Sequence, residues 1–335
     1  MSRANLELNL GKRCNNRCVF CLDGNAPRES REWVPLERAR GELQHAREQG
    51  ADSVGLLGGE PTAHPQIREI VALAKELGFA RIALATNALK LADEAFARAL
   101  VHAGVTRFSI SIHGHTAEIE DALSGRAGNH ARKLRAIDHL LALRREGHLP
   151  DNVSLNPVLT ARNLDSMLAF VVAFRRRGID DVRYNLVRTD ACPDRAEELT
   201  PALPAVREQV LHTVAVNRRM LRIHLSFGDL PLCAYPWEVL DDGELARATV
   251  GELRDLDTSV AVFGAPRDEE RGAARFVWRE RKRSALKLQP DEVCRHCRVR
   301  DVCEGLWRST HDLCGVAGLQ PVRTRPRWMG SVAGP

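Results

Sequence analysis

The chain has 335 residues, 44% hydrophobic and 28% charged, a composition typical of an ordinary globular protein. The net charge of +5 comes from Lys and Arg residues scattered along the chain, which does not indicate nucleic-acid binding. No stretch approaches the length of a transmembrane helix, and a strand-like segment at Leu6 leaves no room for a signal peptide. With nine cysteines, these features predict a cytoplasmic protein whose thiols bind metal, with no membrane partner.

Strands and helices alternate through the first half of the chain. Apolar alternation predicts strands, and apolar residues at helical spacing predict helices between them. The expected strands are 6–10, 53–57, 81–85, 108–112, 153–157 and 181–186, and the expected helices are 36–49, 65–77, 94–102, 129–146 and 164–177. Such alternation produces right-handed βαβ units with a parallel sheet. We therefore expect an α/β fold, a partial (β/α)6 TIM-like barrel over residues 1–190, with its active site at the carboxyl ends of the strands.

The pattern changes after the sixth strand. Residues 191–228 are expected to form a connecting segment with a loop, a helix over 204–220 and a strand over 221–227. Residues 229–322 carry most of the remaining cysteines and are expected to form a small C-terminal extension. The stretch 241–287 is charged and shows no clear periodicity, and the basic tail 323–335 is expected to be mobile.

Three cysteines follow the first strand: Cys14, Cys18 and Cys21. Three thiolates at this spacing can ligate a [4Fe–4S] cluster and leave one iron open for a small chelating molecule. A zinc site is the alternative, but zinc usually takes four ligands and no His lies nearby. Disulfides are not expected, because the number of thiols is odd and no export signal precedes them.

A second motif, Gly58-Gly59-Glu60, closes the second strand. Two glycines let the backbone come close to a ligand, and the Glu60 carboxylate can accept a hydrogen bond from an ammonium group. The alternative is a simple turn between strand and helix.

The cysteine spacing, with Phe20 before the last Cys, and the Gly-Gly-Glu stretch together resemble the radical S-adenosylmethionine (SAM) superfamily. The resemblance implies that Gly58, Gly59 and Glu60 hold the SAM amino group. Ala88 stands where this family usually has Gly, after Thr-Asn. Further expected SAM contacts are Phe20, Asn87, Ser111, Arg126, Asn156 and Val187. For Ser111 and Asn156 the alternative is ordinary strand-end hydrogen bonding.

A second cysteine group, Cys294, Cys297 and Cys303, resembles the auxiliary-cluster segment of SPASM and twitch extensions. Six cysteines lie outside the first triplet, fewer than the seven or eight of a full SPASM domain, so one auxiliary [4Fe–4S] cluster is expected. Cys233 is the expected fourth ligand and Cys314 the alternative, with zinc as the alternative metal. Cys192 is either a buried spectator or a hydrogen donor to a substrate radical.

The resemblance implies an oxidoreductase- or lyase-type enzyme that reductively cleaves SAM to a 5′-deoxyadenosyl radical, which abstracts a substrate hydrogen. The expected substrate is a ribosomally made peptide or natural-product precursor. The alternative is oxidation, rearrangement or cyclisation of a nucleotide, sugar or cofactor precursor. A binding protein built on zinc or a cluster is disfavoured by Gly58-Gly59-Glu60. Expected partners are an electron donor such as flavodoxin or ferredoxin and, because the cluster loop begins at Cys14, a separate peptide-recognition protein.

Overall fold

The computed structural model describes residues 5–23, 32–253, 258–261 and 286–330. These residues form two compact units, which are described separately. The first contains the described residues up to Asn156 together with 258–261, and the second contains 157–253 and 286–330. This division falls after Asn156, and the domain boundary expected near residue 190 stays a prediction.

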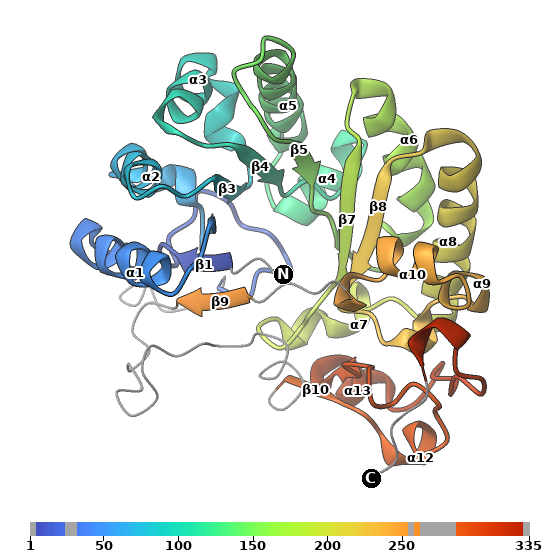
Figure 1. The fold of residues 1–335 in the computed structure, drawn as a ribbon. Coiled ribbons are helices and arrows are strands. Elements are labelled where there is room, and N and C mark those ends of the chain that lie inside the picture. The colour runs from blue at the N-terminus through green and yellow to red at the C-terminus, as the bar shows by residue number, and fades with distance from the viewer. Residues whose placement is uncertain (1–4, 24–31, 254–257, 262–285, 331–335) are drawn as a thin grey trace. The chain divides into compact units, whose positions relative to one another are not determined.

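The first unit is built on a parallel sheet (Figure 1). Its strands run in the order β5-β4-β3-β2-β1-β9, and every neighbouring pair is parallel. The strands are β1 (Asn5–Asn9), β2 (Ser53–Leu57), β3 (Arg81–Thr86), β4 (Arg107–Ile110), β5 (Val153–Leu155) and β9 (Thr258–Ala261). The first five were predicted, whereas β9 lies in the stretch that showed no periodicity.

Four helices lie along one face of this sheet (Figure 1). They are α1 (Leu36–Glu48), α2 (Ile67–Glu76), α3 (Glu94–Ala103) and α5 (Asn129–Arg145). Each lies within a few residues of its predicted range. An additional helix, α4 (Ala117–Ser124), was not predicted; the Thr116 side chain caps its start and Gly125 ends it in a left-handed conformation.

The second unit contains three parallel strands in the order β6-β7-β8. They are β6 (Val158–Leu159), β7 (Asp181–Leu186) and β8 (His224–Gly228). The strand predicted over 221–227, within the connecting segment, corresponds to β8, which pairs in parallel with β7. The helices are α6 (Met167–Arg177), α7 (Ala196–Leu199), α8 (Leu203–Val216), α9 (Trp237–Leu240) and α10 (Gly243–Thr249).

The C-terminal part of the second unit is a small antiparallel hairpin of β10 (Lys287–Leu288) and β11 (Leu306–Trp307). Helix α12 (Asp291–Cys294) lies between the two strands in sequence, and α13 (Arg308–Cys314) follows them. In the tail that is expected to be mobile, Arg325 pairs with Asp301 at 2.7 Å. The last five residues lie outside the described part.

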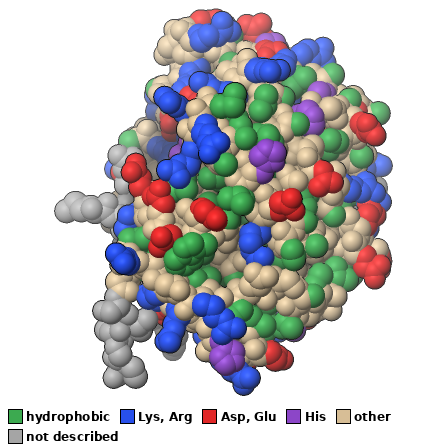
Figure 2. Space-filling view, turned by 90° about the vertical axis from the view of Figure 1, so that its right-hand side faces the viewer, with side chains coloured by type: hydrophobic (Ala, Val, Ile, Leu, Met, Phe, Trp, Pro, Cys, Tyr) green, Lys and Arg blue, Asp and Glu red, His purple; other side chains and the backbone are tan. Residues whose placement is uncertain are grey.

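The surface carries both signs of charge. On the face shown in Figure 2, Lys and Arg side chains are interspersed with acidic and hydrophobic ones and do not gather in one patch. Within the described ranges, none of the helices has the length and apolar character needed to cross a bilayer.

Candidate functional site

The cysteine loop leaves the carboxyl end of β1 in the first unit. Cys14 is exposed, whereas Cys18 and Cys21 are half-buried. Two hydrogen bonds reach the Cys14 sulfur, from the Asn16 backbone N–H at 3.4 Å and from Asn87 Nδ2 at 3.6 Å. The Cys18 sulfur accepts one from Asn16 Nδ2 at 3.3 Å. The loop therefore already directs N–H groups at two of its three sulfurs.

Although Cys14 is exposed as a residue, desolvation by the surrounding loop raises the pKa of its thiol to about 11, and burial raises that of Cys18 to about 12. The charges of Glu60 and Cys21 raise the Cys14 pKa further, and those of Cys21, Glu120 and Cys14 raise the Cys18 pKa. Such thiols are poor free nucleophiles at neutral pH, and a bound metal would be needed to hold them as thiolates. Their chemistry suits ligation and not nucleophilic catalysis.

The two glycines after β2 pack directly against the cysteine loop. The Gly59 N–H donates to Gly11 O at 2.7 Å, and the Glu60 N–H donates to Arg13 O at 2.8 Å. A Cβ on Gly59 would lie 2.2 Å from Arg13 O, and one on Gly58 would lie 2.5 Å from Gly11 O. The glycines therefore allow a close approach between two backbone segments and fix the cysteine loop to the neighbouring strand end.

Glu60 is 1% exposed, and its carboxylate accepts four hydrogen bonds from the protein. Oε1 accepts from the Thr62 N–H at 2.9 Å, the Thr62 hydroxyl at 2.5 Å and the Thr86 hydroxyl at 2.6 Å. Oε2 accepts from the Asn87 N–H at 2.6 Å. The carboxylate thus joins the ends of β2 and β3, and only Oε2 retains room for a further donor.

Ala88, after Asn87, stands where the sequence departs from the usual Gly. Ala88 has φ +63°, a left-handed conformation that Gly adopts without strain. Asn87 Nδ2 also donates to Asn15 Oδ1 at 2.7 Å, so this turn contacts the cysteine loop.

The other expected SAM contacts lie in different environments. Phe20 is buried with its ring edge-on to His113, the ring centroids 4.8 Å apart. Ser111 is half-buried at the end of β4, and Arg126 is exposed on the turn between α4 and α5. Asn156 ends the first unit, with its N–H donating to Ile110 O at 2.8 Å. Val187 is buried in the second unit, after β7.

A buried ion pair near the loop was not predicted. Lys133 Nζ donates to Glu120 Oε1 at 2.5 Å and to Ser111 O at 2.7 Å, and both charged side chains are 0% exposed. Glu120 Oε2 accepts from the backbone N–H groups of His113 at 2.5 Å and Gly114 at 3.0 Å. The pair therefore holds the carboxyl end of β4 in place. The positive charge of Lys133 also partly offsets the effect of burial on the Cys18 pKa.

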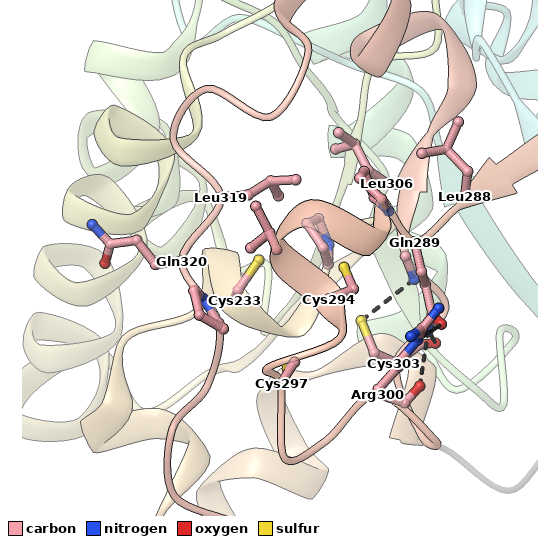
Figure 3. A pocket seen from close by; sticks show the side chains of 15 residues that line it. Cys233, Leu288, Gln289, Cys294, Cys297, Arg300, Cys303, Leu306, Leu319 and Gln320 are labelled. Atoms are coloured by element: carbon pink, nitrogen blue, oxygen red, sulfur yellow. Dashed lines mark hydrogen bonds between the residues drawn. The ribbon is translucent and has the colours of Figure 1, made fainter.

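The second unit holds a separate cysteine cluster. Cys233, Cys294, Cys297 and Cys303 line one mainly apolar cavity, together with residues such as Leu288, Pro290, Leu306 and Leu319 (Figure 3). Burial, and then the neighbouring thiols, raise the pKa of Cys233 to about 12 and of Cys294 to about 11.

The cavity is built around the β10–β11 hairpin. Cys303 is buried, and its sulfur accepts from the N–H groups of Leu232 and Gly305, both at 3.4 Å. Gly305 has φ +88°, and a Cβ there would lie 2.3 Å from Leu288 O. The hairpin therefore brings the loop of Cys294 to Cys303 against the turn that carries Cys233.

Two cysteines stand apart from these groups. Cys314 ends α13 and is not among the residues that line the cavity. Cys192 is half-buried after β7, at the start of a 3-10 turn. Across the described part of the chain, no three His, Cys, Asp or Glu side chains converge closely enough to hold a single metal ion.

Comparison with known sequences finds a family match and several relatives. Residues 8–171 match the sequence model of the Radical SAM superfamily. The chain is 30% identical over 214 residues to the AdoMet-dependent heme synthase of Methanosarcina barkeri and 30% identical over 227 residues to the PqqA peptide cyclase of Rhodopseudomonas palustris. These matches cover 64% and 63% of this chain but 58% and 56% of the relatives, so the chain spans less than three-fifths of their length.

Solved structures share the fold. SuiB of Streptococcus suis, bound to S-adenosylmethionine, has a TM-score of 0.63 at 17% identity, covering 96% of this chain and 76% of SuiB. This likeness shows the expected α/β partial barrel. The family match spans both motifs, Cys14 to Cys21 and Gly58 to Glu60. Residues 8–171 form a radical SAM domain, of the enzyme superfamily whose members use a [4Fe–4S] cluster and S-adenosylmethionine.

Proposed function

We propose that the chain binds a [4Fe–4S] cluster through Cys14, Cys18 and Cys21 and cleaves SAM reductively. The observation that carries this proposal is the direct backbone contact between the cysteine loop and Gly58-Gly59-Glu60. Three thiols and the Gly-Gly-Glu turn then face the same carboxyl edge of the parallel sheet, where ligands bind in α/β folds. Three thiolates ligate three irons of such a cluster, which leaves the fourth iron free to bind a chelating molecule beside Glu60.

The chain's own residues would hold and orient the two groups. The open Oε2 position of Glu60, next to the Asn87 N–H, is suited to accept from the SAM amino group. Phe20, buried against His113, presents an apolar surface beside the loop. When bound, the cluster supplies the electron that breaks a C–S bond of SAM and yields the hydrogen-abstracting radical.

We further propose that Cys233, Cys294, Cys297 and Cys303 ligate one auxiliary [4Fe–4S] cluster. Their shared cavity supports Cys233 over Cys314 as the fourth ligand. Four thiolates satisfy all four irons, so this cluster would carry electrons and not bind substrate. The net reaction is then an oxidation or bond formation, with flavodoxin or ferredoxin as the external electron donor.

The test is anaerobic reconstitution followed by iron analysis and measurement of 5′-deoxyadenosine. The wild type should bind about eight irons and cleave SAM on reduction. Changing Cys14, Cys18 and Cys21 to Ala should leave about half the iron and abolish cleavage, whereas Cys192→Ala should keep the full iron content. Tightly bound zinc in the cavity of the second unit, with a single cluster elsewhere, would disprove the auxiliary site.

For the substrate we propose a ribosomally made peptide or related precursor. The PqqA peptide cyclase is similar in sequence, and another SuiB structure, bound to its precursor peptide SuiA, has a TM-score of 0.60 at 17% identity over 96% of this chain. The check is co-expression with any short peptide encoded beside the gene, followed by mass spectrometry. An unmodified peptide after SAM turnover would contradict this choice.

A small-molecule substrate is the second candidate. This candidate is favoured by sequence similarity to a probable GTP 3′,8-cyclase of Saccharolobus solfataricus. The two sequences are 29% identical over 181 residues, which span 53% of this chain and 54% of the relative. A nucleotide that accelerates 5′-deoxyadenosine formation, together with peptides that do not accelerate it, would favour a small-molecule substrate.

A further inference from the structure

The Cys18 sulfur has a hydrogen-bond donor that is itself held by a second side chain. Asn16 Nδ2 donates to Cys18 Sγ at 3.3 Å, and Asn16 Oδ1 accepts from Asn129 Nδ2 at 2.8 Å. Asn129 Nδ2 also lies 3.0 Å from Ser124 Oγ. A chain of two amides therefore runs from a helix to a predicted cluster ligand.

The inner end of this chain is rigid. Asn129, the first residue of α5, is 1% exposed, and Ser124 is 0% exposed. Asn16, by contrast, lies on the loop and is half-buried. An amide can present either its oxygen or its NH2 group to a neighbour, so the partner on the far side decides which one faces the sulfur. Asn129 occupies the Asn16 oxygen and so turns the Asn16 NH2 group toward Cys18.

The loop backbone is fixed to the same segment. The Val19 N–H donates to Leu123 O at 3.0 Å. A Cβ on Gly125 would lie 2.1 Å from Arg17 O, so the turn after α4 lies directly on the loop. Substitution of the amides therefore leaves backbone contacts that keep the loop in place.

We propose that Asn129 is a positioning residue that sets the reduction potential of the N-terminal cluster through Asn16, an inference that rests on the proposed function. An N–H group directed at a ligand sulfur stabilises the more negative, reduced cluster and raises its potential. Asn129 acts indirectly, because it orients the Asn16 NH2 group that donates to Cys18 and does not itself contact a cluster ligand.

The test is a reduction-potential titration of the reconstituted holoenzyme, following the part of the EPR signal that changes when SAM is added. Asn129→Ala should shift the oxidised-to-reduced ratio about tenfold toward oxidised at a given potential, which is about 59 mV for a one-electron couple. Asn16→Leu should produce a shift of the same size. The double variant should shift no further than either single variant, because both changes interrupt one path.

Asn129→Asp tests the same orientation, and its negative charge lowers the reduction potential in the same direction. A carboxylate at 129 accepts only, so it draws the Asn16 NH2 group away from Cys18 and turns the Asn16 oxygen toward the sulfur. The reduction potential of the N-terminal cluster in Asn129→Asp should therefore lie below that in Asn129→Ala. The control is Asn152→Ala, which removes an Asn whose side chain accepts from the Val153 N–H, at the start of β5; its potential should match the wild type.

Loaded N-terminal clusters with unchanged potentials in Asn129→Ala and Asn16→Leu would overturn the inference. Additive shifts in the double variant would also overturn it, since the two residues would then act separately. A wild type whose N-terminal cysteines hold no cluster would instead disprove the proposed function, so the two failures can be distinguished.

Discussion

The buried pair of Lys133 and Glu120 allows a quantitative stability prediction. Lys133→Met keeps most of the apolar stem but removes the charge that neutralises Glu120. The Glu120 carboxylate would keep its two backbone donors, at 2.5 and 3.0 Å, and would lose its counter-charge at a site 0% exposed. Breaking one partner of a buried ion pair costs about 3–5 kcal/mol, because the remaining charge is desolvated and unpaired.

The double variant Lys133→Met/Glu120→Gln separates this charge effect from lost packing. The amide introduced by Glu120→Gln is neutral, and its oxygen can still accept from the N–H groups of His113 and Gly114. The double variant should therefore be more stable than Lys133→Met by about 2 kcal/mol. Arg135→Met, an exposed cation on the same helix, is the matched control and should change stability by less than about 0.5 kcal/mol.

The assay is urea unfolding of the metal-free protein, followed by circular dichroism. A Lys133→Met variant as stable as Arg135→Met would refute the reasoning. So would a double variant less stable than the single one, because the cost would then come from packing and not from an unpaired carboxylate.

Three other predictions concern the clusters and pH. Cys233→Ala should lose the auxiliary-cluster iron while 5′-deoxyadenosine still forms, and Cys314→Ala should keep that iron; the reverse result would exchange their roles. Gly59→Ala should lose the N-terminal cluster, because its Cβ would lie 2.2 Å from a carbonyl oxygen of the loop, whereas Gly55→Ala, with 3.9 Å of clearance, should not. Burial lowers the pKa of His113 from 6.5 to about 4, so the unfolded chain binds the proton first as pH falls. Stability should therefore drop by about 1.4 kcal/mol per pH unit between pH 6.5 and 4, and a His113→Gln variant that kept this slope would contradict the assignment.

Short-range patterns in this sequence carried the motifs and most elements of the fold. The spacing of Cys14, Cys18 and Cys21 and the Gly58-Gly59-Glu60 turn are local, so they are visible without knowledge of tertiary contacts. Regular β–α alternation likewise predicted the five strands β1 to β5 of the first unit. It failed for β9, which lies in a charged stretch without periodicity. It predicted the strand that is β8 but not the pairing of β8 with β7, because a strand's partner is not encoded in its own alternation.

Side-chain partners from different elements were decided by the tertiary structure. Glu120 and Lys133 lie 13 positions apart on two helices, and Asn16 and Asn129 lie 113 positions apart. Cys233 joins the later cysteines only because the β10–β11 hairpin and a distant turn enclose one cavity. The sequence alone determined which chemistry the chain can hold, since ligand types and their spacing are local. Which buried groups surround each cysteine site was decided by helix and strand packing, because burial and pairing depend on contacts between segments far apart in the chain.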